Sequence, residues 1–266
     1  MAFLTLRGEP LGSFAAVLFD KDGTLSHSEP LLITLAQARV FHCRRHLIEA
    51  HPELGEGPVH ELEQLLGRAY GLDPAGVHPA GTTAVASREH NRISTATALA
   101  QVGLGWPEAL ALADAVFLET DGLARGNAVA QPTEGLAAVL EALRALGVTC
   151  AVISNDDEEG IDRFLAHNGL AEYFTACWSA DHRPCKPDPG AVRGLCARLG
   201  VEPERCLLIG DANSDLRMAR AAGLPKALGY TAGWRRRPPL DPAFAQLHHW
   251  SELEVLPEIE SRNTSA

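Results

Sequence analysis

The amino-acid sequence predicts an α/β protein, with a doubly wound parallel-sheet core and an inserted all-α domain. Two patterns lead to this fold class. In the second half of the chain, short apolar segments alternate with helical segments, which is typical of strands and helices in a parallel sheet. After the first apolar segment comes a long stretch that is helical throughout. The chain has 266 residues and is 46% hydrophobic, which suits one or two globular domains with ordinary cores.

The core is predicted from three segments with the length and apolar character of buried parallel strands. They cover residues 15–19, 148–153 and 206–209. Helical patterns cover residues 133–146, 158–168, 189–199 and 213–222. Asp188 before Pro189 is a typical helix start, with an N-cap aspartate and a proline at the first helical position. Strands that alternate with helices in this way predict a Rossmann-like sheet with helices on both faces. At the C-terminal end, the capping-box pattern of Ser251 and Glu254 predicts a last short helix.

The inserted domain is predicted from four helical stretches separated by loops rich in glycine and proline. They cover residues 30–50, 59–70, 83–102 and 107–119, and we expect no strand among them. A helical block that follows the first strand of such a sheet predicts a second domain over the carboxyl ends of the strands, where open sheets bind ligands. We therefore expect a core made of residues 1–25 and 131–266, and a helical cap made of residues 26–130.

Charge and composition restrict the partners. The chain carries 23 Lys and Arg against 34 Asp and Glu, a net charge of −11, so its overall field does not attract nucleic acid or anionic lipid. Its longest apolar runs are far shorter than the ~20 residues of a membrane span, and the first apolar run leads directly into charged residues, unlike a signal peptide. We expect a cytoplasmic protein that is a monomer or a weak homodimer. Its partner should be a small molecule, and neither nucleic acid nor a membrane.

Polar side chains follow all three predicted strands. They are Asp20 and Asp22, then Ser154 and Asn155, then Asp211 and Asp215. Gly23 allows a ligand to approach the backbone closely. Any single aspartate here also suits a turn or a helix cap, but four carboxylates around one point repel each other and require a cation. An all-oxygen site suits magnesium, so the convergent set predicts a Mg²⁺ site.

Four motifs, in this order along the chain, resemble those of the haloacid dehalogenase-like hydrolase superfamily. They are Phe19-Asp20-Lys21-Asp22-Gly23-Thr24-Leu25, Val152-Ile153-Ser154-Asn155, Lys186-Pro187-Asp188-Pro189 and Gly210-Asp211-Ala212-Asn213-Ser214-Asp215. The resemblance covers the core, whereas the insert is similar only in position and helicity to the cap of the phosphoglycolate-phosphatase-like branch. It implies a magnesium-dependent phosphatase that hydrolyses a small phosphorylated metabolite.

The resemblance also implies roles for these residues. Asp20 is the nucleophile that forms an aspartyl-phosphate, and Asp22 is the general acid and base. Asp20, Asp211, Asp215 and the backbone of Asp22 hold magnesium. The phosphoryl group is bound by Ser154, Asn155, Lys186 and Gly23. Lys186 has separate support, because the chain has only three lysines among its basic residues and one of them stands here.

Other functions stay open as alternatives. A sugar phosphomutase of the same superfamily shares the four motifs, but such mutases resemble one another in a histidine twelve positions after the nucleophile, where this chain has Leu32. Dehalogenases of the superfamily lack the second carboxylate, so Asp22 favours phosphoryl transfer. A catalytically idle binding module is the alternative from another class.

Two polar features of the sequence each allow two interpretations. Lys21 departs from the family, which usually has an apolar residue there; it either points aside or pairs with a neighbouring acid. Arg88, His90 and Arg92 form the richest polar cluster of the insert and could bind a substrate carboxylate or second phosphate, although a solvated helix face is favoured.

Overall fold

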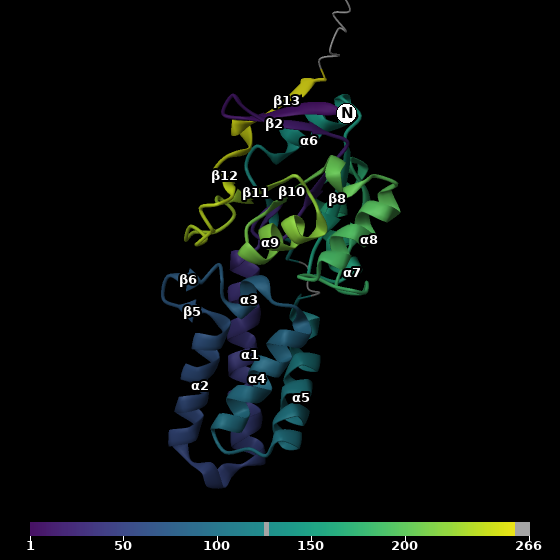
Figure 1. Cartoon of the computed structure of the whole chain (residues 1–266). Coiled ribbons are helices and arrows are strands. Elements are labelled where there is room, and N and C mark those ends of the chain that lie inside the picture. Colours follow the sequence, from purple (N-terminus) through teal and green to yellow (C-terminus); the bar gives the residue numbers. More distant parts are fainter. Residues whose placement is uncertain (125–127, 259–266) are drawn as a thin grey trace, which may run out of the picture. The chain divides into compact units, whose positions relative to one another are not determined.

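The structure is a computed structural model that describes residues 1–124 and 128–258 (Figure 1). It divides into two compact units. The core unit contains residues 1–26, 132–233 and 240–266, and the helical unit contains residues 27–131 and 234–239. The predicted ranges also take in residues 125–127 and 259–266, which lie outside the described part of the chain. No helix within that part combines the length and the apolar character that crossing a membrane requires.

The core unit is built on a six-stranded sheet in which all strands are parallel. Its order is β12 (Ala245–Leu247), β11 (Lys226–Tyr230), β10 (Cys206–Gly210), β3 (Ala16–Phe19), β8 (Thr149–Ile153) and β9 (Phe174–Trp178). The predicted fold class is confirmed, and β3, β8 and β10 are the three predicted strands. The chain runs outward from β3 in both directions, which is the doubly wound topology.

Four helices accompany this sheet: α6 (Leu136–Ala145), α7 (Glu158–His167), α8 (Pro189–Leu199) and α9 (Asn213–Ala222). They match the four predicted helical patterns. Helices α8 and α9 cover one face, where one apolar cluster joins them to alternate residues of β3, β8 and β10. This cluster includes Leu18, Ile153, Leu195, Leu208 and Met218, all at most 2% exposed. Short 3₁₀ turns at Ala171–Tyr173 and Pro203–Arg205 lead into β9 and β10.

A second, antiparallel sheet in the core unit corrects one prediction. It has the order β13 (Leu253–Pro257), β1 (Ala2–Leu6) and β2 (Glu9–Phe14). The predicted helix at Ser251 is wrong, because only a 3₁₀ turn at Trp250–Glu252 forms before the chain becomes β13. Pairing with β1 decides the conformation: the backbone of β13 completes a ladder, and the Thr5 hydroxyl donates to Glu254 at 2.7 Å.

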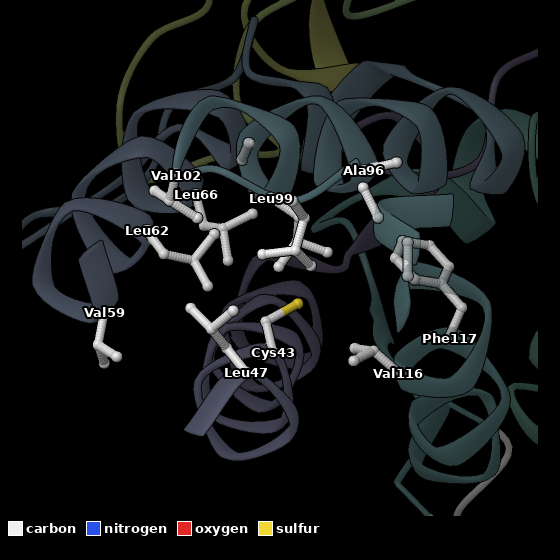
Figure 2. Close-up of a cluster of buried hydrophobic side chains, with 14 of the residues drawn as sticks. Cys43, Leu47, Val59, Leu62, Leu66, Ala96, Leu99, Val102, Val116 and Phe117 are labelled. Atoms are coloured by element: carbon white, nitrogen blue, oxygen red, sulfur yellow. The ribbon is translucent and has the colours of Figure 1, made fainter. Parts of the chain in front are cut away.

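The helical unit packs around one apolar cluster (Figure 2). Its long helices are α1 (Glu29–Ala50), α2 (Glu56–Tyr70), α4 (Arg88–Gln101) and α5 (Trp106–Ala124). Leu47 of α1, Leu66 of α2 and Leu99 of α4 are fully buried in it, and Phe117 of α5 closes one end. Each helix thus contributes an apolar stripe to a shared interior, as the periodicity predicts.

Small corrections apply to the helical unit. The predicted helix 83–102 is two helices, α3 (Thr82–Val85) and α4, because Ala86 is extended and the Ser87 hydroxyl caps α4 by accepting from the His90 N–H at 3.3 Å. The expected absence of strands is wrong in a minor way. Two-residue strands occur at β5 (Leu72–Asp73) and β6 (Gly76–Val77), and at β4 (Ser26–His27) and β7 (Gln131–Pro132), where the chain leaves and re-enters the core unit. A 3₁₀ turn covers Pro52–Leu54.

The polar cluster of the insert is occupied by local ion pairs. Arg88 forms a two-pronged pair with Asp121, with its Nη2 at 2.7 Å from Oδ2. Arg92 pairs with Glu89 at 2.7 Å and with Asp114 at 2.9 Å. These contacts agree with the favoured interpretation of a solvated helix face.

One segment belongs to a different unit from the one predicted. The sequence predicts residues 234–239 in the core, but they are part of the helical unit. The buried Glu29 carboxylate explains this, since it accepts from the Arg235 N–H at 2.8 Å and from the Val77 N–H at 3.3 Å. Arg236 adds an ion pair to Asp73 at 2.6 Å. The chain therefore passes between the units four times.

Candidate active site

The site is built where neighbouring strands of the core sheet end. Strand β3 lies between β10 and β8, with Phe19 in register with Ile209 on one side and Val152 on the other. The residues that follow these positions therefore meet at one edge of the sheet. The topology reverses between β3 and β10, and such a switch point leaves a crevice outside the carboxyl ends of the strands. The sheet thus places the predicted polar residues around one point.

Three carboxylates and one ammonium occupy this point. Asp20, Asp211 and Asp215 are each at most 6% exposed, and one oxygen from each lies within 4.8 Å of the others. Lys186, which is 5% exposed, places its Nζ 2.5 Å from Asp20 Oδ1 and 2.8 Å from Asp215 Oδ1. It also donates to the Ile153 carbonyl at 3.3 Å. Lys186 therefore lies against the carboxylates predicted as nucleophile and metal ligands.

The charge balance of the cluster favours a bound cation. Three buried carboxylates face a single ammonium, and burying negative charge without compensation costs several kcal/mol per group. Burial raises the pKa of Asp20 to about 6, with Lys186 acting to lower it and the charges of Asp215 and Asp22 adding to the rise. The donors are all oxygen, which is the set that magnesium prefers. The residues present thus suit a divalent cation, and in the described part of the chain no other such triad comes together.

The loop after β3 carries Asp22 and Gly23. Gly23 has φ +79°, in the left-handed region that favours glycine, and its N–H donates to the Ser26 carbonyl at 3.0 Å. Gly233 lies directly against it, because a Cβ at position 233 would be 1.8 Å from the Gly23 carbonyl oxygen. Two glycines therefore let two backbone segments meet beside Asp22. Gly233 belongs to none of the four motifs, and only the fold brings it here.

Lys21 pairs with neighbouring acids, which decides between its two interpretations. Its Nζ lies 2.6 Å from Asp22 Oδ1 and 3.0 Å from Asp156 Oδ2. Although burial lowers the pKa of Lys21, the charges of these two carboxylates raise it above its usual value. No motif marks Asp156, which stands in a run of acids at a helix start, where acids are common.

The remaining predicted residues lie close to the same edge. Ser154 is 2% exposed, its N–H donates to the Trp178 carbonyl at 2.9 Å, and its hydroxyl accepts from the Asp156 N–H at 3.1 Å. Asn155 follows it and is partly exposed. Thr24 is a further residue without a predicted role: fully buried, it donates to Asp211 Oδ1 at 3.2 Å. Its place in the first motif was the only signal.

Solved structures share this fold. A predicted phosphoglycolate phosphatase from Haemophilus somnus superposes with a TM-score of 0.62 at 20% identity, covering 89% of this chain and 95% of that one. A 2-haloacid dehalogenase from Pseudomonas syringae superposes with a TM-score of 0.53 at 28% identity, covering 90% of this chain and 96% of its own. Proteins with different named activities therefore share the same architecture.

Sequence comparisons give the family. A protein of Rhodobacter capsulatus named phosphoglycolate phosphatase is 29% identical over 91% of this chain and 96% of its own length. A phosphoglycolate phosphatase of Thiobacillus denitrificans is 40% identical, but that match spans only 36% of this chain and 42% of the relative. The model of the haloacid dehalogenase-like hydrolase family matches residues 14–223, which include all four motifs and the carboxylate cluster. The chain therefore belongs to the haloacid dehalogenase-like hydrolases.

Proposed function

We propose that this protein is a magnesium-dependent phosphatase that hydrolyses a small phosphomonoester through an aspartyl-phosphate on Asp20. The observation that carries the proposal is the placement of Asp20: a buried carboxylate at a strand end, 2.5 Å from the Lys186 ammonium and grouped with Asp211 and Asp215. A nucleophilic carboxylate beside a cation and a metal site is the arrangement that phosphoryl transfer requires. The relatives named above make 2-phosphoglycolate the first ester to test.

The residues divide the reaction into two steps. In the first, a carboxylate oxygen of Asp20 attacks phosphorus, the ester P–O bond breaks, and Asp22 gives its proton to the departing alkoxide. In the second, Asp22 takes a proton from water as the water oxygen attacks the same phosphorus, which releases phosphate and restores Asp20. Lys186, Ser154 and Asn155 neutralise or hydrogen-bond the phosphoryl oxygens. A magnesium ion held by Asp20, Asp211, Asp215 and the backbone of Asp22 would neutralise charge on the phosphoryl group.

Three rival functions are less well supported. Asp22 argues against carbon–halogen cleavage, despite the dehalogenase among the similar structures, because that reaction has no leaving alkoxide to protonate. Leu32 is part of α1 and has no side-chain group that could hydrogen-bond a sugar hydroxyl, which argues against a phosphomutase. An idle binding module has no need of a buried, cation-paired nucleophile.

We also propose a cytoplasmic location and a monomer or weak homodimer.

A panel of about fifty phosphate esters, scored for phosphate release with Mg²⁺, tests the proposal and ranks the substrates. The Asp20→Asn variant should lose about 10⁴-fold in kcat, because the nucleophilic charge is removed at nearly constant shape. Asp162→Asn makes the same change on an exposed helical position and should leave the activity unchanged. Retention of a few per cent of activity by Asp20→Asn would refute the nucleophile. Primer-dependent conversion of glucose 1-phosphate to glucose 6-phosphate, faster than any phosphate release, would establish the mutase instead.

A further inference from the structure

We infer that Lys21 is a positioning residue: tied to Asp156, it fixes the Asp22 carboxylate for proton transfer to the leaving group. This inference rests on the proposed function and adds a residue pair to it. The side chain of Lys21 links two loops. One loop follows β3 and carries Asp20 and Asp22, and the other follows β8 and carries Ser154 and Asp156.

Lys21 is held at both ends. Its carbonyl accepts from the Ser26 N–H at 3.0 Å and from the Ser26 hydroxyl at 3.1 Å. Its ammonium lies 2.6 Å from Asp22 Oδ1, and only 7% of Lys21 is exposed. The ring of Phe164, in α7, lies 5.8 Å from Nζ and borders the ammonium on another side. A lysine side chain has a flexible stem, and these contacts together with its burial restrict that freedom.

Asp156 supplies the fixed end of this link. Its N–H donates to the Ser154 hydroxyl at 3.1 Å, and its carbonyl accepts from the Ala180 N–H at 2.8 Å. Its Oδ1 accepts from the Asp157 N–H at 3.0 Å, which leaves Oδ2 directed at Lys21. Gly160 makes this orientation possible, since a Cβ there would lie 2.5 Å from Asp156 Oδ2. The Asp156 carboxylate is therefore anchored to the second loop by backbone contacts.

The geometry favours positioning over substrate binding by Lys21. Its charge already faces two carboxylates at 2.6 and 3.0 Å, and its side chain is 8% exposed. Lys186 by contrast lies on the nucleophile itself. A misplaced general acid loses much of its effect, and the Asp22 side chain is 24% exposed. The Lys21 ammonium ties the Asp22 carboxylate to Asp156, in the loop that carries Ser154.

The leaving group separates positioning of Asp22 from a general structural role. p-Nitrophenyl phosphate has a good leaving group that needs little protonation, whereas phenyl phosphate has nearly the same shape and depends more on the general acid. Lys21→Met keeps the length of the side chain and removes the ammonium. We expect it to lower kcat for phenyl phosphate at least about tenfold more than kcat for p-nitrophenyl phosphate. Asp156→Asn should shift the same ratio less, and Lys226→Met, at an exposed lysine, should not shift it.

Asp22→Asn provides the reference for a double-mutant cycle. If Lys21 acts through Asp22, adding Lys21→Met to Asp22→Asn should cause no further loss. Equal losses on both esters, a rise in KM alone, or a full further loss in the double variant would overturn the inference while leaving the proposed function in place. If Lys21→Met does not fold, the ratio in Asp156→Asn decides, and an unchanged ratio overturns the inference. Wild-type protein that releases phosphate from neither of these esters nor from any ester of the panel would overturn the proposed function and the inference together.

Discussion

Asp20 should make the stability of the metal-free protein depend on pH in a sense opposite to that of an ordinary salt-bridged aspartate. Burial raises its pKa from 3.8 to about 6 in the folded protein. A raised carboxyl pKa stabilises the fold at low pH, and this contribution is lost as the pH rises through about 6. The full shift corresponds to about 3 kcal/mol, with no reduction for solvent because Asp20 is 6% exposed.

Comparison with Asp20→Asn isolates this contribution, because the asparagine does not ionise and other titrating groups are common to both proteins. Between about pH 5 and about pH 8, the stability of Asp20→Asn relative to wild type should grow by roughly 1–2 kcal/mol. In thermal melts with a chelator, this is a shift on the order of 5 °C. A difference that stays constant or shrinks as the pH rises would refute the argument.

Added magnesium should change how the stability of wild type depends on pH. The ion binds the ionised form of Asp20, so at about pH 5 a proton must leave first and the apparent affinity should be about tenfold weaker than at about pH 8. The stabilisation of wild type by added Mg²⁺ should therefore be larger at the higher pH, and Asp20→Asn should lose this dependence. Calorimetric titration at the two pH values checks the affinity directly, and equal affinities would contradict the role of Asp20 as a ligand.

Two further predictions concern groups around the cluster. Lys186→Met should destabilise the metal-free protein by about 3–5 kcal/mol in denaturant titrations, since it leaves Asp20 and Asp215 without their shared buried cation, and unchanged stability would contradict this. Gly233→Ala should lower kcat, because its Cβ would displace the Gly23 backbone beside Asp22. Gly67→Ala, where a Cβ meets nothing within 4 Å, is its control, and equal effects of the two would refute the packing argument.

The sequence was most informative where function and topology coincide. Asp20, Ser154 and Asp211 could be placed together because the carboxyl ends of neighbouring parallel strands lie at one edge of a sheet. Contacts that depend on tertiary packing could not be predicted. The Lys21–Asp156 pair needs the exact pairing of β3 with β8 and the space left by Gly160. Strand β13 forms because of a partner at the other end of the chain, and local capping signals do not include that partner.

The six residues from Trp234 to Pro239 have a consequence for exchanging domains between related proteins. The helical unit does not consist of one continuous insertion, since this later segment is bound to Glu29 and Asp73. A chimaera that takes residues 27–131 from this chain alone would bury the Glu29 carboxylate without the Arg235 N–H that it accepts from. A chimaera that carries the helical unit therefore has to include both stretches of sequence, residues 27–131 and residues 234–239.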